Sequence, residues 1–194
     1  MAKKSLRRVT RRKVRYDDMM AAVFESDGVD FKSSIILRAA LIDVGLERII
    51  KSRMRKLNSD DYNALFTGTA PLAGLSGKIR IAYALGLIGP KAKHDLTVIN
   101  EIRNTFAHAP HTLTLRNERL WARANSLHTN QDFASKQFFR GLPLTRERRF
   151  LWAVALYNLD LYFIRPRRTV VVARKKLKPS SSKDIERWGR VLQF

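Results

Sequence analysis

The chain has 194 residues, of which 45% are hydrophobic, and its formal net charge is +21. This size suits one domain with a sizeable core and short extensions, and it leaves no room for a second full domain. The absence of cysteine excludes disulfides and thiolate zinc sites, and no apolar run reaches the ~20 residues of a membrane span. We therefore expect a soluble, cytoplasmic protein.

The two ends of the chain carry most of the positive charge. Residues 1–15 contain eight Lys or Arg and no acid, and residues 165–194 contain ten Lys or Arg against two acids. Blocks of like charge resist packing and attract polyanions. They suit contact with DNA or RNA, although a solubilising tail or an anionic membrane surface would also use such charge. The predicted nucleic-acid contacts are Lys3, Lys4, Arg7, Arg8, Arg11, Arg12, Lys13, Arg15, Arg167, Arg168, Arg174, Lys175, Lys176 and Lys178.

The first half of the middle region predicts two helices. Over 33–55, apolar residues recur at spacings of three and four with charge on the other face, which is typical of a long amphipathic helix. Ser33 and Ser34 are the expected caps of its start. A short helix opened by Ser59 is predicted over 58–66, and a loop rich in Gly and Pro follows it.

Three further helices are predicted downstream. One covers 78–88, and a second covers 90–108, with proline in its first turn and another proline just after its end. The third, over 147–166, is the most apolar. The β-branched run at 169–176 suits a strand or an extended arm, and an apolar stripe within 185–192 predicts a small docking helix.

The predicted fold class follows from these elements. No two strand-like runs alternate so as to build a sheet, so we expect an all-α protein, a compact multi-helix domain with basic N- and C-terminal extensions. The boundaries are a basic arm over 1–15, a helical domain over 16–166 and a basic tail over 167–194.

Several short motifs between residues 71 and 108 occur in one register. They are Pro71-Leu72, the run YALGLI from Tyr83 to Ile88, Asp95-Leu96, and the run IRNTFAH from Ile102 to His108. Together with the upstream helix they resemble the mannitol operon repressor family, and the likeness covers roughly residues 20 to 115. The resemblance implies an all-helical domain in transcriptional or sugar-uptake regulation. It also suggests a protein partner in a sugar-uptake system.

Arg103, Asn104 and His108 are in addition similar to the arginine–histidine motif of HEPN domains, many of which are metal-independent ribonucleases. A histidine near neutral pKa can move the proton of a ribose 2′-OH, and an arginine can hold the phosphorane charge. Five helical residues turn about 500°, so Arg103 and His108 lie roughly 140° apart. The two side chains would therefore meet only through the length of arginine, a frayed helix end or a homodimer.

A structural role for the same residues is the other interpretation. Arg103 and Asn104 would then bond to loop carbonyls, Asp95 or Asp43, and His108 would cap the helix end. Of the two functions left open, we expect a nucleic-acid-associated regulator rather than the HEPN-type ribonuclease, and thus binding rather than catalysis.

No cofactor or metal is predicted from spacing. Of His94, His111 and His128, only His94 has an acidic residue directly beside it, which does not support a metal site. Trp121 lies among Arg116, Arg119 and Arg123, a mixture that would suit a nucleic-acid surface, although tryptophan is more often a core residue.

Overall fold

The computed structural model describes residues 30–129 and 145–163 of the chain. The described helices are α3 (Phe31–Lys51), α4 (Ser59–Phe66), α5 (Leu75–Ala84), α6 (Pro90–His108), α7 (Glu118–Asn125) and α9 (Arg146–Phe163). No strand occurs in these ranges, which confirms the all-α fold class. The predicted arm over 1–15, the tail over 167–194, the run at 169–176 and the helix within 185–192 lie outside the described residues.

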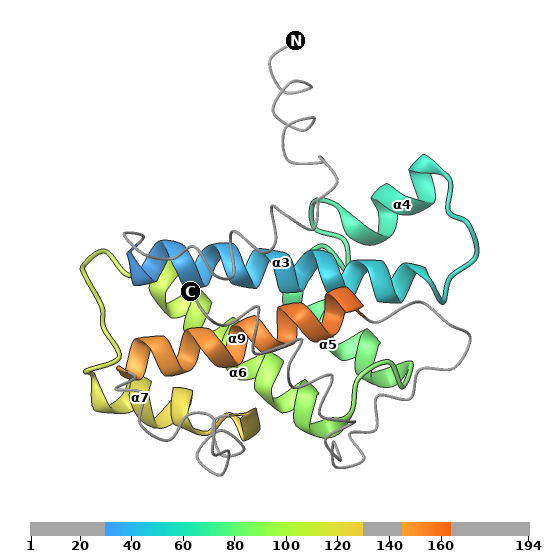
Figure 1. Ribbon diagram of the computed structural model, residues 1–194. Helices are drawn as coiled ribbons and strands as arrows, with labels where there is room; N and C mark the ends of the chain where they lie inside the picture. The colour runs from blue at the N-terminus through green and yellow to red at the C-terminus, as the bar shows by residue number, and fades with distance from the viewer. Residues whose placement is uncertain (1–29, 130–144, 164–194) are drawn as a thin grey trace, which may run out of the picture.

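Helix α3 packs against α9, α5 and α6, which lie below it in Figure 1. The predicted apolar stripe forms its buried face, which consists of Ile35, Ala39, Ile42, Leu46, Ile49 and Ile50. The prediction that Ser33 and Ser34 cap the helix is wrong. Asp30 is the N-cap residue, and its side chain accepts a 3.1 Å hydrogen bond from the Ser33 backbone N–H. The helix ends at Lys51, before the predicted end at residue 55.

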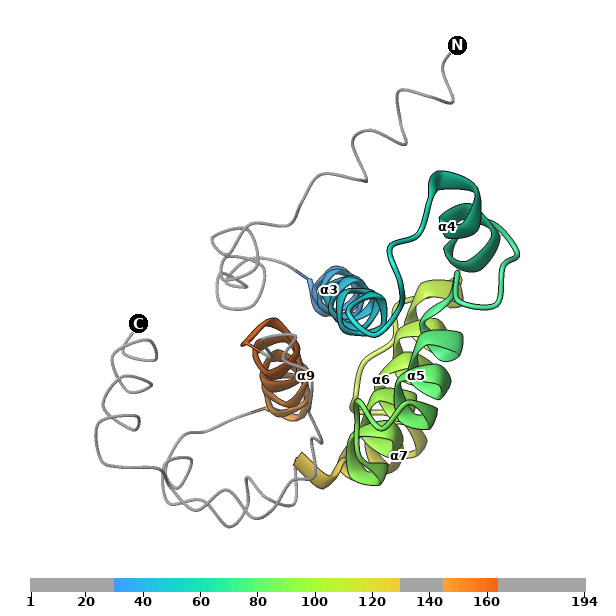
Figure 2. The same ribbon diagram turned by 90° about the vertical axis from the view of Figure 1, so that its right-hand side faces the viewer.

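Helices α3 and α9 run side by side, and α5 and α6 lie on the opposite side of the core (Figure 2). Helices α3 and α9 approach each other closely at Gly45 of α3, where an added Cβ atom would lie 3.0 Å from the Cβ atom of Leu161 in α9. At the other end of the core, Phe31 packs edge-on against Phe106 of α6 at 5.1 Å and Phe150 of α9 at 6.2 Å. The three main helices thus share one apolar core.

The predicted end of the helix over 78–88 is wrong, and the connection between α5 and α6 shows why. Helix α5 ends at Ala84 rather than residue 88, because Gly86 takes a φ of 67° and reverses the chain. The Leu87 N–H then bonds to the Ala82 carbonyl, the pattern that stops many helices at glycine. Helix α6 has the predicted limits, since Pro90 occupies its first turn and Pro110 follows its end.

Helix α7 was not predicted. Asn117 caps its start by accepting from the backbone N–H groups of Arg119 and Leu120. Helix α9 covers most of the predicted 147–166 segment and is buried along much of its length. None of the described helices is long and apolar enough to cross a membrane.

Candidate nucleic-acid interface

The fourteen residues predicted to contact nucleic acid all lie in the arm and the tail, outside the described ranges. They therefore remain predictions. Within the described residues, positive charge gathers at the C-terminal end of α3. The exposed basic side chains there are Arg48, Lys51, Arg53, Arg55 and Lys56, and no acidic residue interrupts the run.

These cations, which we call the α3 basic rim, border a hollow of about 1140 Å³. Four of them line it, together with side chains from α4, α5 and α9. Lys51 lies 4.7 Å from the ring centroid of Tyr62 in α4, a cation–π contact that holds its stem over an aromatic face. The hollow therefore combines exposed cations with an aromatic wall.

The end of α9 is fixed against this rim by Arg48. Its guanidinium donates hydrogen bonds to the backbone carbonyls of Leu161 and Tyr162, the second at 2.7 Å. Those carbonyls belong to the C-terminal turn of α9, where a cation is favoured by the helix dipole. Tyr162, next to the last residue of α9, lines the hollow, so this end of the helix lies beside it.

The floor of the hollow is an ion network. Lys78 is buried and contacts Asp43 Oδ2 at 2.6 Å and Glu47 Oε2 at 3.1 Å. Tyr62 donates to the other Glu47 oxygen at 2.9 Å. Burial raises the pKa of Asp43, although Lys78 opposes this effect by its hydrogen bond and its charge. On the rim, Lys51 lies 3.8 Å from Glu47 Oε1, whereas no ion pair with a described acid is found for Arg55 or Lys56.

The RNTFAH run occupies the last two turns of α6. Arg103 and Asn104 are half-buried and His108 is exposed. The Arg103 guanidinium donates to Asn104 Oδ1 at 2.8 Å, whereas Asp43 pairs with Lys78. The structure thus joins Arg103 to Asn104, and among the described residues no hydrogen bond links either of them to His108.

The helix end is held instead by Phe106, which is fully buried in the core. Asp95, the other carboxylate considered as a partner of Arg103, is bonded elsewhere in the fold. Among the described residues, no hydrogen bond joins Arg103 to either aspartate, although the charge of Arg103 acts to lower the pKa of Asp43.

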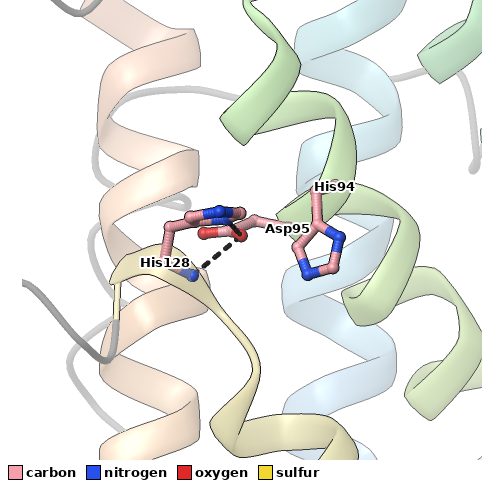
Figure 3. Close-up of side chains that lie close together, drawn as sticks. All are labelled: His94, Asp95 and His128. Atoms are coloured by element: carbon pink, nitrogen blue, oxygen red, sulfur yellow. Dashed lines mark hydrogen bonds and ion pairs between the residues drawn. The ribbon is translucent and has the colours of Figure 1, made fainter.

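Asp95 forms a buried polar cluster that spacing along one helix did not indicate. Its carboxylate is 0% exposed and accepts from the backbone N–H, at 2.9 Å, and the ring Nδ1 of His128 (Figure 3). It also accepts from the backbone N–H and hydroxyl of Thr129 and from the hydroxyl of Tyr157. Burial raises the pKa of Asp95, but these hydrogen bonds outweigh burial and hold it below its usual value.

The residues joined to Asp95 come from distant parts of the chain. Thr129 and Tyr157 lie 34 and 62 positions away in sequence. In the sequence, Asp95 was noted only as part of the Asp95-Leu96 motif of the family resemblance. That motif did not indicate which residues bond to the Asp95 carboxylate.

Trp121 is not an open stacking surface. Its ring is half-buried against the core and is covered by the guanidinium of Arg146, 5.1 Å from the ring centroid. Arg146 pairs with Glu118, and Arg123 pairs with Glu101, each at 2.7 Å. Two of the basic residues near Trp121 thus have acidic partners, unlike Arg55 and Lys56 of the rim, for which no ion pair with a described acid is found.

A comparison with known protein families decides the relationship. The family model described as mannitol repressor matches residues 26–152. The chain belongs to the mannitol repressor family. No curated protein and no solved structure shows significant similarity to it.

The mannitol repressor match extends further than the 20–115 likeness, since it reaches into the first half of α9. It includes the α3 basic rim, the RNTFAH run and the Asp95 cluster except for Tyr157. The basic arm over 1–15 and the tail over 167–194 lie beyond it. Membership of a repressor family supports a regulatory role in broad terms, and the HEPN likeness finds no support in the match.

Proposed function

We propose that this mannitol repressor family member regulates transcription by binding nucleic acid. The basic arm over 1–15, the basic tail over 167–194 and the α3 basic rim would hold the nucleic acid. The observation that carries the proposal is the contact of the rim with the C-terminal end of α9, which lies four positions before the start of the basic tail in sequence. Arm, rim and tail together would present cations to successive phosphates, and such contacts give affinity rather than sequence preference. The proposal places the protein in the cytoplasm and leaves the regulated operon open.

The described helices support backbone contact more than base reading. The rim consists of cations in the last turn of α3 and just after it, and it does not form the exposed face of a second, groove-reading helix. Sequence preference, if the protein has it, would then come from the arms, a homodimer or a protein partner. A partner in a sugar-uptake system is one such candidate, proposed on the family resemblance alone.

Charge reversal at the rim tests the proposal. We expect Arg55→Glu with Lys56→Glu to weaken binding to duplex DNA by about tenfold or more and to lower the salt slope by about two, since each phosphate contact contributes about one. The measurement is fluorescence anisotropy across a range of salt concentrations.

The matched control carries the same change in net charge at the opposite end of α9. Arg148 and Arg149 are exposed in its first turn, and their replacement by glutamate should change the salt slope much less. Equal losses in the two variants would mean that only net charge matters and would contradict a role for the rim.

The HEPN-type ribonuclease is the alternative, and the contact between Arg103 and Asn104 is the observation in its favour. It requires the wild-type protein to cleave single-stranded RNA in the presence of EDTA and to leave DNA intact. His108→Ala would then lower cleavage by about 10²–10⁴-fold, whereas His111→Ala, a change at an exposed loop histidine, would not. We expect intact RNA from wild type and from both variants, and cleavage that depends on His108 would replace the regulator proposal.

A further inference from the structure

An apolar strip runs along α3 beside α9. Leu37 and Val44 are 47% and 49% exposed, and they are two of the four large hydrophobic side chains that are exposed among the described residues. They lie seven positions apart and therefore share one face of α3, with the half-buried Leu41 between them. Apolar side chains that continue along one exposed face mark a contact surface.

The part of this strip that belongs to α9 is buried. Ala155 and Leu159 are 1% and 4% exposed, and they form a small apolar cluster. Among the described residues, the half-buried side chains found packed against this pair are only Leu41 and Tyr162. Burial this complete calls for a further apolar cover along the junction of the two helices, which lie side by side in Figure 2.

The sequence just before α3 has the pattern of such a cover. Residues 19–24 read MMAAVF, and Met20, Val23 and Phe24 in this run would share one face of a helix. Serine, aspartate and glycine at 26–28 are typical of a turn, and they separate the run from the start of α3. The pattern predicts a short amphipathic helix that is joined to α3 by a tight connection.

We propose that residues 17–25 form a helix that docks on this strip, antiparallel to α3, with Met20 against Leu37. A connection of only five residues between two helices folds the first back beside the second. Since each helical residue rises 1.5 Å, this register places Met20 within one turn of Leu37 and Arg15 level with about Leu41.

Two features of the segment favour it over other occupants. Its direct connection to α3 closes a short loop, whereas the apolar stripe predicted within 185–192 would have to close the much longer loop after α9. Residues 16–29 also contain four acids and no Lys or Arg, although the net charge of the chain is +21. An acidic segment suits a strip that ends at the cation Arg48, and the basic tail does not.

Docking would bring the basic arm over 1–15 to the α3 basic rim. Arg48 lies about two helical turns beyond Leu41, and 15 extended residues reach up to roughly 50 Å. The arm and the rim would then form one continuous basic surface. This consequence rests on the proposed function, but the docking itself is tested without nucleic acid, so that one can fail while the other stands.

The test uses cysteine pairs introduced into the full-length chain, which has no cysteine of its own. Under mild oxidation, Met20→Cys with Leu37→Cys should form an intrachain disulfide at least about tenfold faster than Ala22→Cys with Leu37→Cys. The two pairs close loops of nearly equal length, but two helical positions turn about 200°, so Ala22 would face away from α3. Mass spectrometry of quenched samples measures the rates.

The other occupants of the strip give different products. Leu37→Cys alone would form a disulfide-linked dimer if a second copy covers the strip, and Leu37→Cys with Trp188→Cys would cross-link fastest if the tail covers it. Circular dichroism verifies the helical fold of each variant before oxidation. Equal rates for the Met20 and Ala22 pairs, or either of these other products as the fastest to form, would overturn the proposal.

Discussion

Removal of residues 1–15 and 167–194 is expected to weaken binding to duplex DNA and to RNA by about 10²-fold or more at moderate salt. The two segments hold most of the +21 net charge, and each lost phosphate contact removes the favourable release of a counterion. The measurement is the dissociation constant of the truncated chain beside that of the full chain at the same ionic strength.

A second form of the chain separates charge from length. Replacing the Lys and Arg residues of both segments with serine keeps the number of residues and should reproduce the loss. The described helices lie between Phe31 and Phe163, outside both changed segments, so their circular dichroism signal should persist in both forms. Wild-type affinity in either form would show that the arms are solubilising tails.

Asp95→Ala is expected to lower the free energy of unfolding by about 3–5 kcal/mol. The substitution leaves the backbone N–H groups of His128 and Thr129, the Thr129 hydroxyl and the Tyr157 hydroxyl without their acceptor, a carboxylate that is 0% exposed. Urea denaturation followed by circular dichroism measures the change. The control is Asp60→Ala, which removes an exposed carboxylate from the first turn of α4 and should cost less than about 1 kcal/mol.

The same carboxylate should contribute to acid denaturation. The folded pKa of Asp95 lies below the ordinary value of 3.8, so the folded state binds its proton less readily than the unfolded state does. Its stabilisation is therefore complete above about pH 4 and is lost as the pH falls through the folded pKa. The stability of Asp95→Ala should accordingly fall less steeply below pH 4, and equal slopes would show that Asp95 is not the carboxylate concerned.

The fold was predictable where local signals were strong. Pro90 and Pro110 gave the limits of α6, and the apolar period gave the buried face of α3. The end of α5 depended on the left-handed turn at Gly86, which a continuous apolar run concealed. Helix α7 was missed because half of its eight residues are charged or polar and its cap at Asn117 lies outside any apolar run.

The candidate sites were less predictable because they join distant residues. Asp95 and His128 lie 33 positions apart, and no spacing rule along one helix brings them together. The α3 basic rim is visible in sequence as a run of cations, but the hollow beside it depends on α4 and α9. The Arg103 contact was missed for the opposite reason, since its partner is the adjacent Asn104 rather than a distant carboxylate.

The salt dependence of nucleic-acid binding by the full chain tests the central claim most directly. A labelled duplex and a labelled RNA would be titrated with the protein between 50 and 200 mM salt. We expect binding to both, with a loss of affinity of about 10³-fold or more over this range, as for a protein that makes about six to ten phosphate contacts. No binding at 50 mM salt, or an affinity that salt does not change, would contradict a regulator that holds nucleic acid through its basic arms.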